Sequence, residues 1–377
     1  MSVFEGQGLF CNEEKERPME IKEYIREFSL KDVVRVRNPK VVAFGGGTGL
    51  SVILRGLKKY TNRLTAVVTV GDDGGSSGML REDLGILPPG DIRNCILALA
   101  DDEGVMNDLF NYRFDKGGLA GHSFGNLFLA AMTGISSDFY DAIVRTSDVL
   151  QITGTVLPVT LDEMVLMGEL KDGTLVEGES EIPRASAKSG SPIAKMHLKH
   201  SAAALPETLD AIKAADIIIM GPGSLYTSII PHLLVDGIEE TILASTAKKF
   251  YVGNIMMQPG ETLGYTQADH LLAIEHQQRH GGQGALFDYV IANDGVLDKA
   301  MAVRYRKIGS RQVLVGEHLP AYEYICDNFV IQKDRKVRHD ADRLAKQIFE
   351  IYMGGGSHEF FHGGQGRIVP LADDGSR

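Results

Sequence analysis

The sequence is poor in cysteine, in basic charge and in long apolar runs. Its three cysteines, Cys11, Cys95 and Cys326, are far apart and form no CxxC pair, so neither a zinc site nor a disulfide framework is indicated. Asp and Glu number 50 against 39 Lys and Arg, a net charge of −11. This balance argues against nucleic acid as the main partner, because phosphate backbones need clustered basic side chains. We find no signal-peptide pattern and no apolar stretch of about 18 residues, and we therefore expect a cytoplasmic protein with no membrane partner.

The sequence is rich instead in apolar segments that end in glycine turns. Residues 41–44 run into Gly45-Gly46-Gly47-Thr48-Gly49, residues 64–70 into the turn 71–78, and residues 217–220 into Gly221-Pro222-Gly223-Ser224. In α/β proteins, a buried strand that ends in glycines before a helix brings backbone N–H groups up to a phosphate. Such turns on neighbouring strands form one polar cleft at the carboxyl end of a sheet. The pattern predicts a nucleotide or nucleotide-sugar site.

Short apolar segments alternate with helical ones along most of the chain. We predict strands at 41–44, 64–70, 217–220, 250–255 and 288–293, and helices at 50–59, 91–101, 105–112, 124–132, 137–149, 206–214 and 340–352. This alternation predicts an α/β fold, a Rossmann-like parallel sheet flanked by helices. Strand-like pieces at 155–159, 164–170 and 174–176 predict a small β-rich insertion at about 153–199. The chain then divides into an N-terminal extension (1–38, with an amphipathic helix at 19–28), an α/β domain (39–352) and a flexible tail (353–377).

The first glycine turn is not a dinucleotide fingerprint. The G-x-G-x-x-G frame that starts at Gly45 needs a glycine at position 50, where the chain has Leu50. What remains is a run of small residues whose N–H groups can face an anion, with Thr48 near the start of a helix. The alternative is a tight strand–helix turn without a ligand.

The second turn adds two carboxylates and two hydroxyls, those of Asp72, Asp73, Ser76 and Ser77. In a Rossmann layout, an acid after the second strand contacts ribose hydroxyls. Asp72 or Asp73 could do this, or could hold Mg²⁺ beside a diphosphate. The alternative is an Asx turn, in which the aspartate caps its own loop.

Polar residues at other predicted helix starts and strand ends extend the candidate site. Several of these residues would cap a helix or lie in its first turn, and one aromatic ring could stack on a base or a sugar. The alternative for each is a structural role, in a helix cap or a hydrogen bond, without a ligand. In chain order these residues are Asp91, Arg93 and Asn94, then His122 and Asn126, then Gly221, Gly223, Ser224 and the aromatic Tyr226, and then Asn254, Gln258 and Asp294. No Ser-His-Asp elbow, HExxH motif, P-loop lysine or paired catalytic carboxylate is evident. The sequence therefore indicates a binding cleft more clearly than a catalyst.

Several of these segments, in this order, resemble one family. The motifs that carry the resemblance are VVAFGGGTGL from Val41, TVGDDGGSSGMLR from Thr69, PPGDIRN from Pro88, GHSFGNL from Gly121, GPGSLYTSIIP from Gly221, QPGET from Gln258 and Arg338-His339-Asp340. Over roughly residues 39–352 the chain resembles the bacterial gluconeogenesis factor (YvcK-type) proteins, within the wider superfamily of 2-phospho-L-lactate transferase (CofD-like) proteins. The DDGGSSG loop is similar to the bacterial branch and unlike the transferase branch.

The resemblance implies a Rossmann-like fold that binds UDP-sugars, particularly UDP-N-acetylglucosamine. It implies a regulatory role, in which the protein supports cell shape and wall-precursor supply on gluconeogenic carbon sources, with a homo-oligomer and a protein partner in cell-wall synthesis as further expectations. By the same resemblance, Tyr305 and Arg338 fall where ligand-contacting residues are expected. The segments before Pro39 and after Met353 depart from the family pattern.

Three hypotheses follow. In the first, the protein is a nucleotide-sugar-binding regulator: backbone N–H groups at 45–49 or 221–223 hold the diphosphate, and Asp72 or Asp73 with Asn94 order sugar or ribose hydroxyls. In the second, the same cleft, with Mg²⁺ at Asp72 and Asp73, serves an enzyme that moves a phospholactyl-type group from a nucleotide diphosphate donor to a deazaflavin alcohol. The third, an NAD(P)-linked oxidoreductase, is disfavoured by the broken glycine fingerprint.

Overall fold

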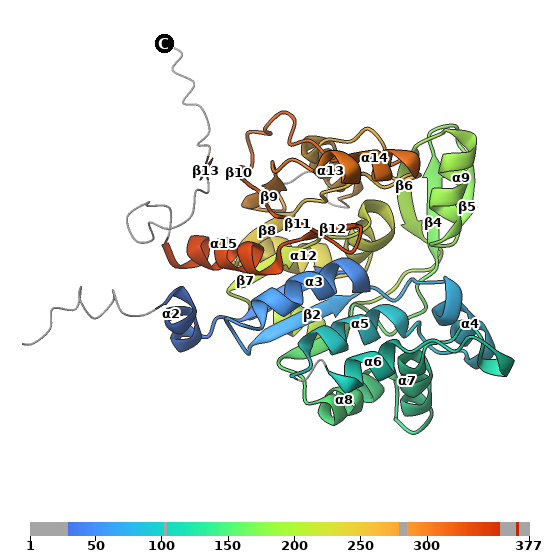
Figure 1. The fold of residues 1–377 in the computed structure, drawn as a ribbon. Helices are drawn as coiled ribbons and strands as arrows, with labels where there is room; N and C mark the ends of the chain where they lie inside the picture. Colours follow the sequence, from blue (N-terminus) through green and yellow to red (C-terminus); the bar gives the residue numbers. More distant parts are fainter. Residues whose placement is uncertain (1–28, 102–103, 279–284, 355–366, 369–377) are drawn as a thin grey trace, which may run out of the picture.

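An eight-stranded sheet runs through the middle of the molecule (Figure 1). The computed structural model describes residues 29–101, 104–278, 285–354 and 367–368. From one edge to the other, the strands are β13 (Arg367–Ile368), β10 (Glu323–Asp327), β9 (Tyr289–Asn293), β8 (Lys248–Val252), β7 (Ile217–Met220), β1 (Val41–Gly45), β2 (Leu64–Val68) and β3 (Thr155–Pro158). All pair in parallel except β13, which is antiparallel to β10. Read outward from β1, this is the doubly wound strand order of Rossmann folds, so the predicted fold class is confirmed.

The central strands are apolar on both faces because helices cover both. Every residue of β1 and β7 is buried. Val41 and Ala43 belong to one hydrophobic cluster, whereas Val42 and Phe44 belong to the other. This division follows from the period of two along a strand, which sends alternate side chains to opposite faces.

One face of the sheet carries α2 (Leu30–Arg37), α3 (Gly47–Leu57), α5 (Gly90–Leu99) and α15 (Ala341–Gly354), which contact one another in the order α2–α15–α3–α5. Helices α3 and α15 cross at close range, because a Cβ atom added at Gly56 would clash with the carbonyl oxygen of Ala341. Leu30 and Val34 of α2 are buried, so this part of the N-terminal extension packs on the domain. The amphipathic helix predicted at 19–28 lies outside the described residues.

Helices α6 (Val105–Asn111), α7 (Phe124–Gly134) and α8 (Phe139–Leu150) extend the layer of α3 and α5, since Phe110, Leu129 and Ile143 belong to the same hydrophobic cluster. The opposite face carries α10 (Pro206–Lys213), the π-helical turn Leu225–Ile229, α11 (Ile230–Leu233), α12 (Ile238–Ala244) and α13 (Gln267–Gln277). Helices α4 (Gly75–Leu84) and α14 (Lys299–Lys307) contribute to neither hydrophobic cluster. Among the described helices, none combines the length and the apolar character that crossing a bilayer requires.

The insertion is smaller than predicted. It is a three-stranded antiparallel sheet, in the order β5-β4-β6, of β4 (Leu166–Leu170), β5 (Leu175–Glu177) and β6 (Ile193–Leu198), with α9 (Glu181–Ser189) packed on it (Figure 1). The predicted start at about 153 is wrong, because Thr155–Pro158 pairs with β2 as the edge strand of the main sheet. A second small unit, the hairpin β11 (Val330–Lys333) and β12 (Lys336–His339), precedes α15.

Candidate functional site

The three glycine turns lie together at the carboxyl ends of β2, β1 and β7. These strands are neighbours. From β1 the chain adds β2 and β3 on one side of the sheet and then returns to add β7 on the other side. This reversal of the strand order makes the junction of β1 and β7 the topological switch point where open α/β sheets bind ligands. The first and third turns are in contact, because a Cβ atom added at Gly49 would clash with the carbonyl oxygen of Pro222. Only glycine permits this approach at position 49.

Three adjoining cavities form a cleft over these turns. The acidic cavity, of about 220 Å³, is lined by Gly46, Gly47, Thr48, Gly49, Thr69, Asp72, Asp91, Glu179, Gly223, Ser224, Thr227 and Ser228. The middle cavity, of about 320 Å³, shares Thr48, Gly49 and Gly223 with it and adds Val52, Pro222, Asn254, Ile255, Met256, Gln258, Val337, Arg338 and His339. The outer cavity, of about 490 Å³, shares Met256 with the middle one and is lined by Val296, Leu297, Ala302, Tyr305, Arg306, Arg311 and Gln312.

Backbone donors face the junction of the acidic and middle cavities. Helix α3 starts at this junction, and its N-cap, Gly46, has no side chain to cap the first turn. The first N–H groups of a helix have no intrahelical partner, so those of Thr48 and Gly49 are donors at the cleft wall. The N–H of Gly47 is already engaged, because it donates to Asp91. An anion is therefore better placed beside Thr48 and Gly49 than beside Gly47.

Carboxyl groups set the character of the acidic cavity. Burial raises the pKa of Asp91 to about 6, and the charge of Asp72 adds to this shift, while the hydrogen bond from Gly47 opposes it. Burial also raises the pKa of Glu179 to about 7, with Asp72 and Asp73 adding to the rise. None of the described lysines and arginines lines this cavity. The cavity thus offers hydrogen-bond acceptors to hydroxyl and amide donors.

The two aspartates of the second turn have different partners. Asp72 lines the acidic cavity, and its Oδ1 accepts a hydrogen bond from Gly74 N–H at 2.9 Å, which is the Asx turn considered as an alternative. Asp73 Oδ1 instead accepts from Ser180 N–H at 3.0 Å, so Asp73 anchors the insertion that supplies Glu179. The described residues contain no group of three or more His, Cys, Asp or Glu side chains placed to hold a metal. A magnesium ion held by Asp72 or Asp73 together with a diphosphate stays a prediction.

Basic side chains lie at the other end of the cleft. Arg338 lines the middle cavity, and Arg306 and Arg311 line the outer one. Arg338 comes from β12, and the hairpin is tied to α14 because Val337 N–H donates to the Tyr305 hydroxyl at 3.0 Å. Charge along the cleft therefore changes from acidic to basic.

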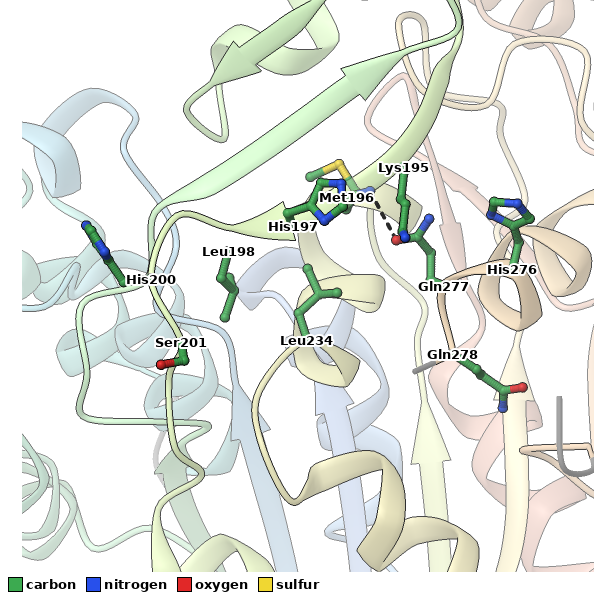
Figure 2. Close-up of a pocket in the computed structure, with 10 residues that line it drawn as sticks. All are labelled: Lys195, Met196, His197, Leu198, His200, Ser201, Leu234, His276, Gln277 and Gln278. Atoms are coloured by element: carbon green, nitrogen blue, oxygen red, sulfur yellow. Dashed lines mark hydrogen bonds between the residues drawn. The ribbon is translucent and has the colours of Figure 1, made fainter. Parts of the chain in front are cut away.

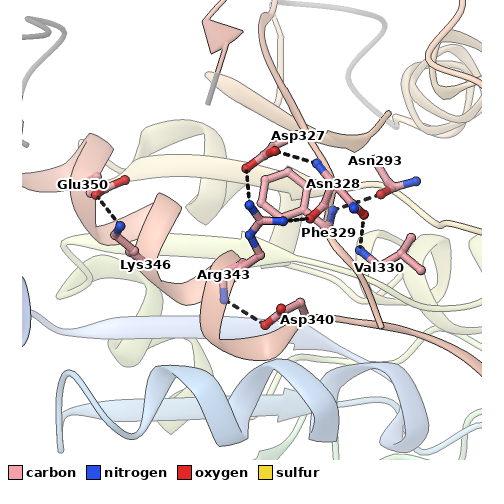
Figure 3. A network of polar contacts seen from close by, with 9 residues as sticks. All are labelled: Asn293, Asp327, Asn328, Phe329, Val330, Asp340, Arg343, Lys346 and Glu350. Atoms are coloured by element: carbon pink, nitrogen blue, oxygen red, sulfur yellow. Dashed lines mark hydrogen bonds and ion pairs between the residues drawn. The ribbon is translucent and has the colours of Figure 1, made fainter. Parts of the chain in front are cut away.

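A polar network fixes the segment from which this hairpin arises (Figure 3). Arg343 Nη1 donates to the Asn328 carbonyl at 2.8 Å, and Arg343 Nη2 lies 3.8 Å from Asp327 Oδ2. Asn293 Oδ1, at the end of β9, accepts from Phe329 N–H at 3.0 Å. These bonds join the start of α15 to the ends of β9 and β10, the strand that leads into the β11–β12 hairpin.

Several predicted residues support the cleft from behind. Ser76 Oγ lies 3.1 Å from His122 Nδ1 and accepts from Asn126 Nδ2 at 3.1 Å. The other three have partners nearby: Ser77 Oγ accepts from Gly90 N–H, and Arg93 donates to Ser123 Oγ and to Asn94 Oδ1. None of Ser76, Ser77, Arg93, Asn94, His122 and Asn126 lines the three cavities. They position the second turn and the start of α5.

Four further predicted residues also lie off the cavities. Tyr226 is buried and its hydroxyl lies 2.8 Å from that of Tyr265, so the stacking expected of it is not available. Asp294 is exposed beyond β9 and lines none of the three cavities. Gly45 and Gly221 are strand-end residues, and Gly221 N–H donates to the Phe44 carbonyl. In contrast, Asn254 lines the middle cavity and holds the third turn by bonds to Gly223 at 2.7 and 3.2 Å.

Sequence reasoning missed several lining residues. Glu179 belongs to the insertion, and no local motif marks it. Ser228 stands in the third-turn motif, one turn beyond Ser224, and His339 stands in the motif that contains Arg338. Burial lowers the pKa of His339 to about 4; the neutral ring lies with Nε2 at 3.1 Å from the Gly253 carbonyl.

Comparisons with known proteins agree with this architecture. The family model of 2-phospho-L-lactate transferase CofD matches residues 41–348. A putative gluconeogenesis factor of Clostridium acetobutylicum is 52% identical over 322 residues, covering 84% of this chain and 70% of that protein. The gluconeogenesis factor of Bacillus subtilis is 47% identical over 320 residues, covering 84% of this chain and 98% of that protein.

A solved structure is similar as well. The crystal structure of a UPF0052 family protein from Bacillus halodurans superposes with a TM-score of 0.78 at 46% identity, and the match covers 82% of this chain and 99% of that one. The glycine turns, the parallel sheet and the match over most of the chain lead to one conclusion. This protein belongs to the 2-phospho-L-lactate transferase CofD family, and the relatives it resembles within that family are named gluconeogenesis factors.

Proposed function

We propose that this protein is a cytoplasmic regulatory protein of the gluconeogenesis factor type that binds a UDP-sugar, with UDP-N-acetylglucosamine as the ligand. The observation that carries the proposal is the change of charge along the cleft. Carboxyl groups line one end and arginines the other, with uncapped helix amides between them. A nucleoside diphosphate sugar has the matching order of groups: hydroxyl donors, then two phosphates, then a nucleoside.

The sugar fits the acidic cavity. Asp72, Asp91 and Glu179 accept hydrogen bonds there, whereas a phosphate among three carboxyl groups would be repelled. The raised pKa values of Asp91 and Glu179 show that this cavity already disfavours negative charge.

The diphosphate fits the junction with the middle cavity. The Thr48 and Gly49 amides stand at the positive end of the α3 dipole, and Arg338 lines the adjoining wall. A charge-assisted hydrogen bond contributes about 1.5–3 kcal/mol, so loss of Arg338 is expected to weaken binding by about 10- to 100-fold.

The nucleoside fits the outer cavity. Met256, Val296, Leu297 and Ala302 supply an apolar wall, and the outer cavity also includes the Gln312 amide and the Tyr305 ring. Apolar walls with a few polar groups are typical of sites for small ligands. The relatives' name, gluconeogenesis factor, supports a role in gluconeogenic growth. We propose that this role is to maintain cell shape on gluconeogenic carbon sources.

Isothermal titration tests the proposal. UDP-N-acetylglucosamine and UDP should both bind the wild-type protein, and Arg338→Leu should weaken both by at least tenfold. Arg304→Leu is the matched control, because Arg304 is exposed on α14 and lines none of the three cavities. Absence of binding at millimolar ligand would overturn the proposal.

The family model favours one alternative, since its name is that of a transferase. In that function the same cleft would hold a nucleotide diphosphate donor and move its phospholactyl group to a deazaflavin alcohol. Incubation with donor, acceptor and Mg²⁺ separates the two functions, because only the enzyme forms a phosphodiester product. A binding protein would leave both compounds unchanged.

A further inference from the structure

A separate pocket of about 400 Å³ lies between the insertion and the main domain (Figure 2). Its walls come from β6 and the residues after it, from Leu234 just after α11, and from the end of α13. It shares no lining residue with the acidic, middle or outer cavities. It is therefore a second hollow, distinct from the cleft.

The lining of this pocket is basic although the protein is acidic. Lys195, His197, His200 and His276 line it, and no carboxyl group of the described residues does, whereas the whole chain has a net charge of −11. The carboxyl group of Glu169 approaches from the neighbouring strand β4, where its Oε2 lies 3.8 Å from His197 Nε2. Lys195 and the three imidazoles outnumber this single carboxyl group as hydrogen-bond donors, which suits the pocket to an anion.

Amide groups on the opposite wall are fixed in place. Gln277 Oε1 accepts a hydrogen bond from Met196 N–H at 3.0 Å, which ties the end of α13 to β6 (Figure 2). Gln278, beside it, is only 8% exposed, and neither of its amide atoms has a hydrogen-bond partner among the residues that the structure describes. A buried polar group without a partner costs about 1–3 kcal/mol, and a ligand in the pocket that bonds this amide would offset that cost.

We propose that this pocket binds a phosphorylated small molecule of the sugar phosphate class. Lys195 and the imidazoles supply donors to the phosphate oxygens, and amides can both donate to and accept from sugar hydroxyls. Leu198 and Leu234 provide an apolar floor. The volume lies within the range of about 300–1,000 Å³ that is usual for small-molecule sites. The inference does not depend on the nucleotide-sugar proposal, because the two sites share no residue.

Binding of a hexose monophosphate, with inorganic phosphate alone as the comparison, tests this site by isothermal titration. Lys195→Met and Gln278→Leu should each weaken hexose monophosphate binding by at least tenfold. Lys199→Met is the matched control, because Lys199 lies on the segment that follows β6 but pairs with Glu177 at 2.9 Å outside the pocket; it should stay within about twofold of wild type. Thermal midpoints establish that each variant is folded.

Two further binding measurements show whether the hexose monophosphate occupies this pocket or the cleft. Saturation with UDP-N-acetylglucosamine, and the Arg338→Leu variant, should leave hexose monophosphate binding unchanged. Loss of binding in either arm would place the phosphate in the cleft and overturn the inference. Absence of binding to the wild-type protein, wild-type affinity in Lys195→Met, or inorganic phosphate that binds as tightly as the sugar phosphate would overturn it equally.

Discussion

The contact between the first and third glycine turns gives a sharp test of the cleft. Gly49→Ala places a methyl group against the Pro222 carbonyl, and Gly56→Ala, two turns along the same helix, places one equally close to the Ala341 carbonyl. Gly49 is at the cleft, whereas Gly56 faces α15. The two variants therefore introduce the same strain at a functional and at a structural position.

The magnitude follows from two opposing effects. Overpacking costs about 1–3 kcal/mol, and a backbone carbonyl cannot rotate away as a side chain can, so we take about 3 kcal/mol. Replacing a helical glycine by alanine returns about 1 kcal/mol. Both variants should then lose about 2 kcal/mol of the free energy of unfolding, measured by urea titration.

Ligand binding should separate the two variants. In Gly49→Ala, the shifted turn moves the Thr48 and Gly49 amides, and affinity for UDP-N-acetylglucosamine should fall at least tenfold, equivalent to about 1.4 kcal/mol. Gly56→Ala should bind within about twofold of wild type. Equal losses of affinity in the two variants, or wild-type affinity in Gly49→Ala, would refute the assignment of this turn to the ligand.

Three further predictions concern the walls of the cleft. Burial raises the pKa of Glu179 from 4.5 to about 7, so its contribution to stability is full below about pH 4.5 and is lost as pH rises through about 7. In urea titrations, the free energy of unfolding of Glu179→Gln should therefore fall less between about pH 5 and pH 8 than that of wild type. Equal falls in the variant and in wild type would contradict this. Tyr305→Phe removes the acceptor of Val337 N–H and should weaken UDP binding about 2- to 10-fold, a reasoning that fails if calorimetry gives wild-type affinity. Asp73→Ala removes the acceptor of Ser180 N–H and should lower the free energy of unfolding by about 1 kcal/mol. Amide hydrogen exchange in residues 166–198 should become faster. Equal exchange rates in the variant and in wild type would exclude the anchoring role.

The sequence predicted the central strands and turns well. Strand β7 occurs at the predicted residues 217–220, and β1 and β2 differ from prediction by one or two residues at their ends. Strands buried on both faces are continuous apolar runs, and glycines mark where they end, so both signals are local. Helices α2, α4, α9, α12, α13 and α14 were not predicted. The residues 155–158 were assigned to the wrong sheet, because pairing with β2 is a long-range event.

The site divides in the same way. The glycine turns, and the chemistry they offer to a phosphate, follow from the sequence, because an exposed amide needs only its own backbone and the absence of a neighbouring side chain. The tertiary structure alone decided that Asp73 turns to Ser180, that Tyr226 turns to Tyr265, and that Glu179 of the insertion lines the same cavity as Asp72. The direction of a side chain depends on what packs around it, and those neighbours come from distant parts of the chain.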